Sequence, residues 1–190
     1  MKNSISVWLA GLMLVCLMKA VHAADAEQGI RFREFSLLTK PPATAVVNNL
    51  RLDYTMNAYL REGLLNGMTL EQEIRFELER YNAWWWNSKT HLVSVHSELQ
   101  YQPVTKQYQV TRLDTQEHWT FPTLPAALQQ LGSLSNYRLP DLPEDAFGNN
   151  ASIFATAVLA PQSLRLPLKL HGLFSDRYAL TSDGVLWPLP

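Results

Sequence analysis

Apolar and polar residues alternate one by one along several stretches of this chain, and Met68–Arg80 shows the pattern most clearly. Its even-numbered apolar positions are Leu70, Ile74, Phe76 and Leu78. The odd-numbered positions from 71 to 79 are all charged, namely Glu71, Glu73, Arg75, Glu77 and Glu79. A strand directs successive side chains to opposite faces, whereas a helix would scatter these charges around its axis. The segment is therefore predicted to be a strand with one face in the core and the glutamate row in solvent.

The same kind of pattern predicts further strands at Arg31–Thr39, Asn48–Asn57, His91–Tyr101, Gln107–Leu113 and His118–Phe121. The last three are joined by the turn segments Pro103–Lys106 and Asp114–Glu117, so an antiparallel meander is expected there. Ala151–Ala160 is predicted to be a buried strand. Arg177–Trp187 is expected to form a terminal hairpin around Ser182-Asp183-Gly184.

Two short segments change to helical spacing. In Ala58–Asn66, Leu60, Leu64 and Leu65 share one face, Asn57 can cap the start, and Asn66-Gly67 can end the helix. A second helix is predicted from Thr123, which can cap it, to Gly132. Its apolar face is expected to consist of Leu124, Leu128 and Leu131.

The remaining segments predict loops. Ser133–Asn150 contains Pro140 and Pro143 and is interpreted as one long loop, while Pro161–Phe174 is ambiguous. The chain has many strands with one solvent-exposed face, short turns and only two short helices. This combination predicts a mainly β fold, with α+β as the alternative. We expect an antiparallel sheet arranged as a sandwich or as a curled sheet covered by a helix, and a βαβ fold is disfavoured.

The first 23 residues have the order of a secretory signal peptide. Lys2 precedes an apolar run from Ile5 to Met18, and Val21-His22-Ala23 supplies small residues for cleavage. An uncleaved anchor is the alternative, but the run is shorter than the roughly 20 residues that a spanning helix needs. We therefore expect cleavage near Ala23, a tether over residues 24–30 and a single β-rich domain over residues 31–190, without a stable membrane span.

Charge and cysteine content narrow the classes of function. Cys16, the only cysteine, lies in the predicted signal peptide, so the mature chain would have no disulfide, thiol nucleophile or cysteine-bound metal. Loss of Lys2 and Lys19 would change the formal net charge of −1 to −3. This weak acidic balance, with scattered lysine and arginine, argues against nucleic acid as a partner.

No motif in the sequence specifies a reaction, a metal or a cofactor. Zinc ligands could come from His96, Glu98 and His118, but the sequence lacks the ligand spacing typical of a zinc site. A catalytic triad could consist of Ser97, His118 and Asp114, but the sequence lacks a nucleophile elbow. The row Glu71, Glu73, Glu77 and Glu79 could imitate paired glycosidase carboxylates. A solvated strand face is the favoured interpretation, because a catalytic acid requires a dry cleft. No catalytic residue, metal or cofactor is therefore predicted.

Trp84, Trp85 and Trp86 are the one candidate interaction surface. If the run continues the preceding strand, neighbouring indoles point to opposite faces and at least one leaves the core. Exposure of an indole forgoes several kcal/mol of burial and is often functional. The alternative is a corner at which all three pack beneath a neighbouring loop.

Several motifs resemble an uncharacterised exported family of Gram-negative bacteria, a domain of unknown function often labelled "proline-rich signal peptide protein". They are Trp84-Trp85-Trp86, Tyr101, Tyr108–Leu113, Phe121–Gly132 and Trp187-Pro188-Leu189. The resemblance spans about Phe32 to Leu189 and implies the periplasm as compartment. Members are often encoded beside a membrane sensor histidine kinase, which implies a link to envelope signalling. The family offers no catalytic residues to carry over.

These observations together favour a non-enzymatic periplasmic accessory or binding protein whose partner is another cell-envelope protein. The alternative is a module that binds polysaccharide or lipid headgroups through the tryptophan cluster, and a hydrolase is the third reading. A protein binder is expected to present an apolar patch or an open strand edge, whereas an enzyme requires a concave pocket with convergent polar groups.

Overall fold

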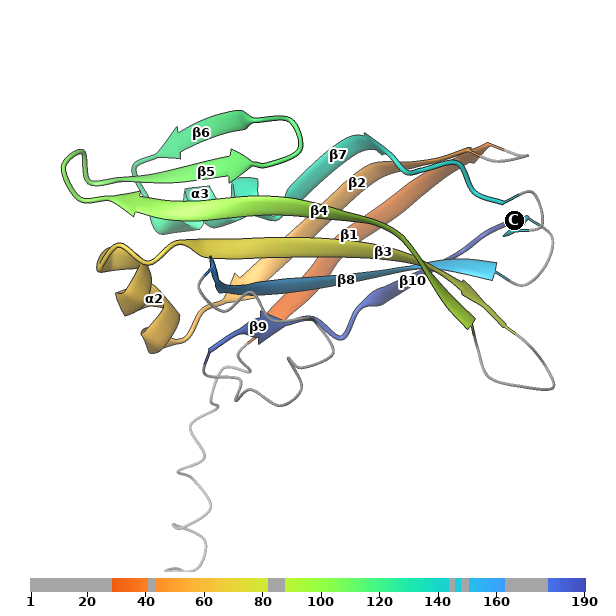
Figure 1. Ribbon diagram of the computed structural model, residues 1–190, viewed down its shortest axis with the longest axis horizontal. Coiled ribbons are helices and arrows are strands. Elements are labelled where there is room, and N and C mark those ends of the chain that lie inside the picture. The colour runs from red at the N-terminus through yellow and green to blue at the C-terminus, as the bar shows by residue number, and fades with distance from the viewer. Residues whose placement is uncertain (1–28, 41–43, 82–87, 144–145, 148–150, 163–177) are drawn as a thin grey trace, which may run out of the picture.

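The computed structural model describes residues 29–40, 44–81, 88–143, 146–147, 151–162 and 178–190, which form two antiparallel sheets and two helices (Figure 1). The strands are β1 (Gly29–Lys40), β2 (Thr44–Thr55), β3 (Leu70–Arg80), β4 (Ser88–Gln102), β5 (Gln107–Arg112), β6 (Glu117–Phe121), β7 (Ser133–Arg138), β8 (Ala151–Pro161), β9 (Leu180–Thr181) and β10 (Val185–Pro188). The helices are α2 (Ala58–Leu65) and α3 (Leu124–Leu131). The prediction of a mainly β, antiparallel fold with two short helices is confirmed.

The larger sheet has the strand order β10-β8-β3-β4-β5-β6, and β9 also pairs with β8. β3 lies near its middle, where Ile74 is opposite both Val95 of β4 and Ala157 of β8. The even-numbered residues of β3 from Leu70 to Leu78 are buried, as the alternation predicted. The meander β4-β5-β6 is also confirmed.

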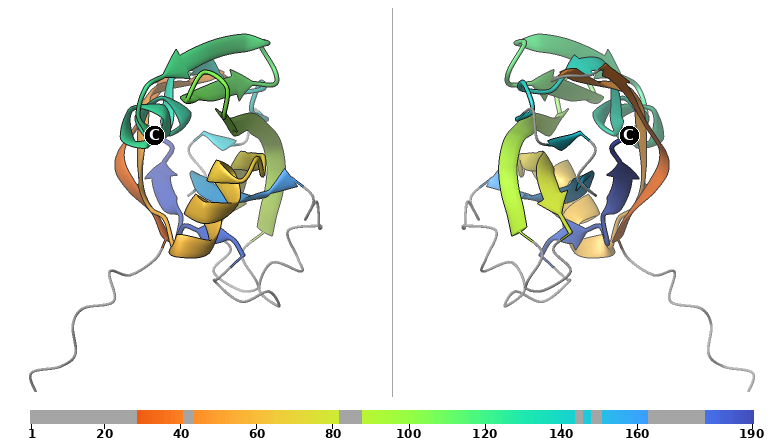
Figure 2. Two further views of the ribbon diagram at one scale, coloured as in Figure 1. Left: turned by 90° about the vertical axis from the view of Figure 1, so that its left-hand side faces the viewer. Right: turned by 90° about the vertical axis from the view of Figure 1, so that its right-hand side faces the viewer.

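The smaller sheet, β1-β2-β7, lies across the inner face of the larger one (Figure 2). Aromatic side chains join the two layers: the ring of Phe35 on β1 lies 6.4 Å from that of Phe76 and 6.1 Å from that of Trp187. Leucine, isoleucine, valine and alanine fill the rest of the space between the sheets. Burial of this shared apolar surface is the main stabilising term that the fold offers.

The two helices lie toward the same end of the molecule (Figure 1). α2 begins as predicted, because the side-chain oxygen of Asn57 accepts a hydrogen bond of 2.9 Å from the N–H of Leu60. The chain leaves α2 through Gly67, whose φ of +90° belongs to the left-handed region that glycine adopts without strain. Within the described ranges, no helix is both long enough and apolar enough to cross a membrane.

α3 covers the predicted residues, but its buried face differs from the predicted one. Ala127 and Leu131 are buried, while Leu124 and Leu128 are only half-buried. The side chain of Thr123 makes no capping hydrogen bond. The helix lies between β2 and the inner side of β4-β5-β6, so two of its faces contact protein.

The prediction of one long loop over Ser133–Asn150 is wrong at its start, because Ser133–Arg138 forms β7 on the edge of the smaller sheet. Leu134 is the one buried residue of this strand. The segment therefore lacks the clear alternation of apolar and polar residues that predicts a strand. The pairing with β2 supplies the hydrogen bonds that the local pattern does not indicate.

The predicted C-terminal hairpin is also wrong. β9 and β10 do not pair with each other, since both pair with β8, at Val158↔Thr181 and at Val185↔Ala155. Ser182 bridges the gap: its N–H donates to the carbonyl of Ala157, and its Oγ accepts from the N–H of Ala157. The segment Ser182-Asp183-Gly184 therefore interrupts the chain that runs alongside β8, between β9 and β10, and does not reverse its direction.

Candidate functional site

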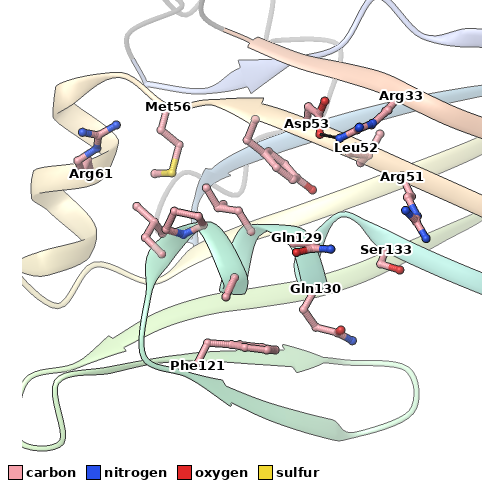
Figure 3. A pocket seen from close by; sticks show the side chains of 15 residues that line it. Arg33, Arg51, Leu52, Asp53, Met56, Arg61, Phe121, Gln129, Gln130 and Ser133 are labelled. Carbon is pink, nitrogen blue, oxygen red and sulfur yellow. Dashed lines mark ion pairs between the residues drawn. The ribbon is translucent and has the colours of Figure 1, made fainter.

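A groove of about 750 Å³ opens between β2 and α3, with contributions from β1, α2 and the end of β6 (Figure 3). It forms because β7 pairs with β2 only as far as Arg51, after which the two chains diverge. Beyond that point α3, rather than another strand, faces β2. Its volume lies in the range of typical ligand pockets.

One wall of the groove is an open edge of β2. The N–H of Leu52 donates to the carbonyl of Gly132 over 3.0 Å, so the main-chain groups of Leu52 point away from β1. These directions alternate along an antiparallel strand, so Tyr54, two residues later in an unbroken register with β1, points its N–H and C=O the same way. Within the described residues no main-chain hydrogen bond joins Tyr54 to α3 or β7.

The other wall, formed mainly by α3, is apolar along part of its length and also carries Gln129 and Gln130. Leu124 and Leu128 line it from α3, Phe121 lines it from the end of β6, and Met56 lies beyond the end of β2 (Figure 3). The sequence pattern assigned both leucines to the core. In the structure α3 turns Ala127 and Leu131 fully inward, whereas the two half-buried leucines pack against the margin of the core and also line the groove.

The charged lining of the groove is mainly cationic. Among the described residues it contains Arg33, Arg51 and Arg61 against a single carboxylate, Asp53. The Arg33 guanidinium lies 3.9 Å from Asp53 and that of Arg51 lies 3.7 Å from Glu34, and all four side chains are largely exposed. Exposed pairs of this kind are weak, so the arginines remain able to exchange these partners for a bound anion.

A buried hydrogen-bond chain fixes the position of β2 beside α3. The Tyr54 hydroxyl donates to Oε1 of Gln72 on β3, and Nε2 of Gln72 donates to the carbonyl of Leu131 over 3.1 Å. Gln72 is 1% exposed. Burial raises the pKa of Tyr54 well above its ordinary value of 10.0, because the phenolate would lose its hydration. The Tyr54 hydroxyl therefore stays protonated at neutral pH and links β2, at the groove, to Gln72 of β3.

The tryptophan run was predicted to be an interaction surface, and the structure does not test this prediction. Trp84, Trp85 and Trp86 lie outside the described residues. The hypothesis that one or two of these indoles leave the core remains a prediction.

The structure does not bring together the residues of the hypothetical catalytic triad, Ser97, His118 and Asp114. Ser97 is 3% exposed and faces the core from β4, whereas His118 lies on the opposite face of the sheet, where its Nδ1 is 3.0 Å from Oγ1 of Thr111. His96 is hydrogen-bonded to Glu71 rather than grouped with Glu98 and His118 as a metal site. Among the described residues, no group of three histidine or acidic side chains could hold a metal ion.

The glutamate row of β3 points away from the core as predicted, but it is not fully solvated. The side chains of Glu71, Glu73, Glu77 and Glu79 are only 14–21% exposed, because β3 has paired strands on both sides. Basic neighbours pair with them: Arg75 lies 3.1 Å from Glu73, and Lys89 lies 3.6 Å from Glu79. These carboxylates are thus part of an ion-paired sheet surface and do not line the groove.

Sequence reasoning missed the groove, because its lining comes from segments as far apart as Arg33 and Ser133. The spacing of Leu124, Leu128 and Leu131 gave no signal of it, because apolar residues at i, i+4 and i+7 are the pattern of a helix that faces the core. The open edge at Tyr54 left no trace in the sequence, since it depends on where β7 stops pairing with β2.

The fold and the groove define a two-sheet, antiparallel β protein with a cationic groove beside an open strand edge. The chain belongs to the family described as "Domain of unknown function (DUF4390)", whose model matches residues 27–188. Searches of the curated proteins and of the solved structures find no match.

Proposed function

We propose that this protein is a non-enzymatic accessory protein of the cell envelope that binds another envelope protein through the groove between β2 and α3. It would act in the periplasm after export, as the N-terminal sequence pattern and the resemblance suggest. A link to envelope signalling would fit such a partner.

The open edge of β2 at Tyr54 is the observation that carries the proposal. An unpaired strand edge is a template for main-chain pairing with another polypeptide, and an adjacent apolar wall gives the side chains of that polypeptide a place to bind. The groove combines the two, with Leu124 and Leu128 opposite the edge. A protein partner makes use of both features.

Photo-crosslinking in exporting cells tests the proposal. We would place the photoreactive residue at Gln129, which is exposed in the groove, and at Thr90, which is exposed on β4 outside the groove lining. The expected result is one envelope protein, identified by mass spectrometry, captured from position 129 and not from position 90. That protein, once purified, should also bind the purified domain directly.

A groove variant then separates specific binding from chance capture. Ala126 lines the groove, so Ala126→Glu should abolish direct binding of the captured protein. Ala58→Glu introduces the same side chain at an exposed position of α2 outside the lining and should leave binding unchanged. Equal capture from both crosslinking positions, or binding that is insensitive to Ala126→Glu in a folded variant, would contradict the proposal.

A further inference from the structure

Resting on that proposed function, we infer that the groove takes an acidic, extended peptide segment of its partner. This segment adds as a short strand to the edge of β2 at Tyr54, continuing the line of β7. Its apolar side chains contact Leu124 and Leu128, and its carboxylates lie against Arg51 and Arg61. The inference specifies the charge and conformation of the ligand.

The extended conformation follows from the main-chain groups of the groove wall. Tyr54 presents an N–H and a C=O on the same side, which is the pattern that a hydrogen-bonded pair of an antiparallel ladder requires. An incoming strand would lie about 4.8 Å from β2. The neighbouring Leu52 already uses this side of β2 to bind Gly132, so the docked strand begins where the contact between β2 and Gly132 ends.

The acidic character follows from the charge around the groove. The chain has a formal net charge of −1, whereas the part of the groove lining that the structure describes has three arginines and one aspartate. Arg61 on α2 makes no ion pair within the described part of the chain, and Arg51 holds Glu34 only over 3.7 Å at the exposed surface. Figure 3 places Arg61 near one end of the groove and Arg51 near the other. A segment with acidic residues near both ends complements this arrangement.

An anionic lipid would satisfy the arginines and the apolar wall but not the strand edge. An acyl chain has no donor or acceptor for the N–H and C=O of Tyr54, which it would cover and leave without partners. A peptide backbone supplies both. The observations therefore favour a polypeptide, and a lipid is an outcome that the experiment can detect.

The test measures binding of fluorescent decapeptides to the purified mature domain by anisotropy. The probes are a peptide of alternating glutamate and valine, its lysine and valine counterpart, and the acidic peptide with alternate backbone nitrogens methylated. We expect the acidic peptide to bind at least tenfold more tightly than the other two. Its affinity should also fall as salt is raised, because the arginines are exposed.

Variants assign the binding to the groove. Arg51→Gln and Arg61→Gln should each weaken binding of the acidic peptide by roughly twofold to fivefold, as expected for exposed ion pairs. Arg138→Gln is the matched control, because Arg138 is also exposed, lies on β7, pairs with Asp141 and does not line the groove. It should leave the affinity unchanged.

Each alternative outcome overturns a defined part of the inference. Equal binding of the lysine peptide rejects the acidic ligand, and undiminished binding of the methylated peptide rejects strand addition. Displacement of the acidic peptide by vesicles of phosphatidylglycerol, but not of phosphatidylcholine, identifies an anionic lipid site. No binding of any peptide up to about 1 mM rejects the inference as a whole. Crosslinking from Gln129 would still succeed in any of the peptide cases if the broader proposal is correct.

Discussion

Gly132 is the residue at which α3, β2 and β7 meet. A β-carbon added there would lie 2.7 Å from the carbonyl oxygen of Leu52 and 2.8 Å from the ring of Tyr54. Its φ is −82°, so the position needs glycine for space and not for backbone conformation. The close approach lets the carbonyl of Gly132 accept from Leu52 and closes one end of the groove.

Gly132→Ala is therefore expected to lower the free energy of unfolding by about 1–3 kcal/mol, because main-chain atoms must shift to admit the methyl group. Gly63→Ala is the control. Its added β-carbon would meet only the flexible end of Met68, at 2.8 Å, so the better helix propensity of alanine should leave stability equal or about 0.5–1 kcal/mol higher. Urea unfolding of both variants measures the difference, and equal losses would contradict the role of Gly132.

Tyr54 should give the protein a measurable alkaline sensitivity. Its pKa is raised in the folded state, so the unfolded state releases the phenolic proton first as pH rises past 10. Below pH 10 the full contribution of Tyr54 to the free energy of unfolding is present. Above pH 10 this contribution falls by about 1.4 kcal/mol per pH unit until the pH reaches the folded-state pKa. Tyr54→Phe should remove this contribution to the slope in unfolding experiments from pH 8 to pH 11.

The same substitution has a second consequence at neutral pH. Removal of the hydroxyl leaves Oε1 of the buried Gln72 without its donor, so Tyr54→Phe should cost about 1–3 kcal/mol at pH 7. An unchanged alkaline slope together with an unchanged stability at pH 7 would show that the Tyr54 side chain is hydrated in solution.

At the scale of elements, α3 divides its apolar residues between the core and the groove. Leu131 is 2% exposed and contributes its carbonyl to Gln72, whereas Leu128 is half-buried. Leu131→Ala should therefore cost about 2–5 kcal/mol, as core truncations do, and Leu128→Ala should cost about 1 kcal/mol or less. Thermal unfolding distinguishes them, and similar losses would mean that Leu128 is core rather than groove lining.

β3 should be the most protected element of the larger sheet. It is paired along its whole length with β8 on one side and β4 on the other, whereas β6, among the described strands, is a sheet edge paired only with β5. Amide hydrogen exchange should therefore be slowest in β3 and markedly faster in β6. Faster exchange in β3 than in β6 would contradict this strand order.

For the whole molecule, the N-terminal sequence pattern predicts export with cleavage near Ala23. Mass measurement of the protein recovered from the envelope fraction should show the loss of about 23 residues. A full-length product in the cytoplasm would contradict both the signal peptide and the periplasmic function proposed above. A full-length product held in the membrane would indicate an anchor instead.

Residue alternation by itself determined much of the fold. The alternation of Ile74 and Phe76 with Glu73 and Glu77 specifies a strand and the face that is buried. With a period of two, a single assignment of faces places all the apolar residues in the core. Asn57 and Gly67 likewise specify the ends of α2 through local hydrogen bonding and backbone freedom. Such features depend on neighbours in the chain, and sequence reasoning reaches them.

Tertiary structure alone decided the rest. β7 is a strand because β2 pairs with it, and β9 and β10 lie along β8 rather than against each other, so neither feature is encoded by local pattern. The groove exists because β7 leaves β2 after Arg51, which exposes the main-chain groups of Tyr54 and brings Arg61 to the same opening. Which main-chain groups stay unpaired is a property of how distant strands meet, and no single segment of the sequence records it.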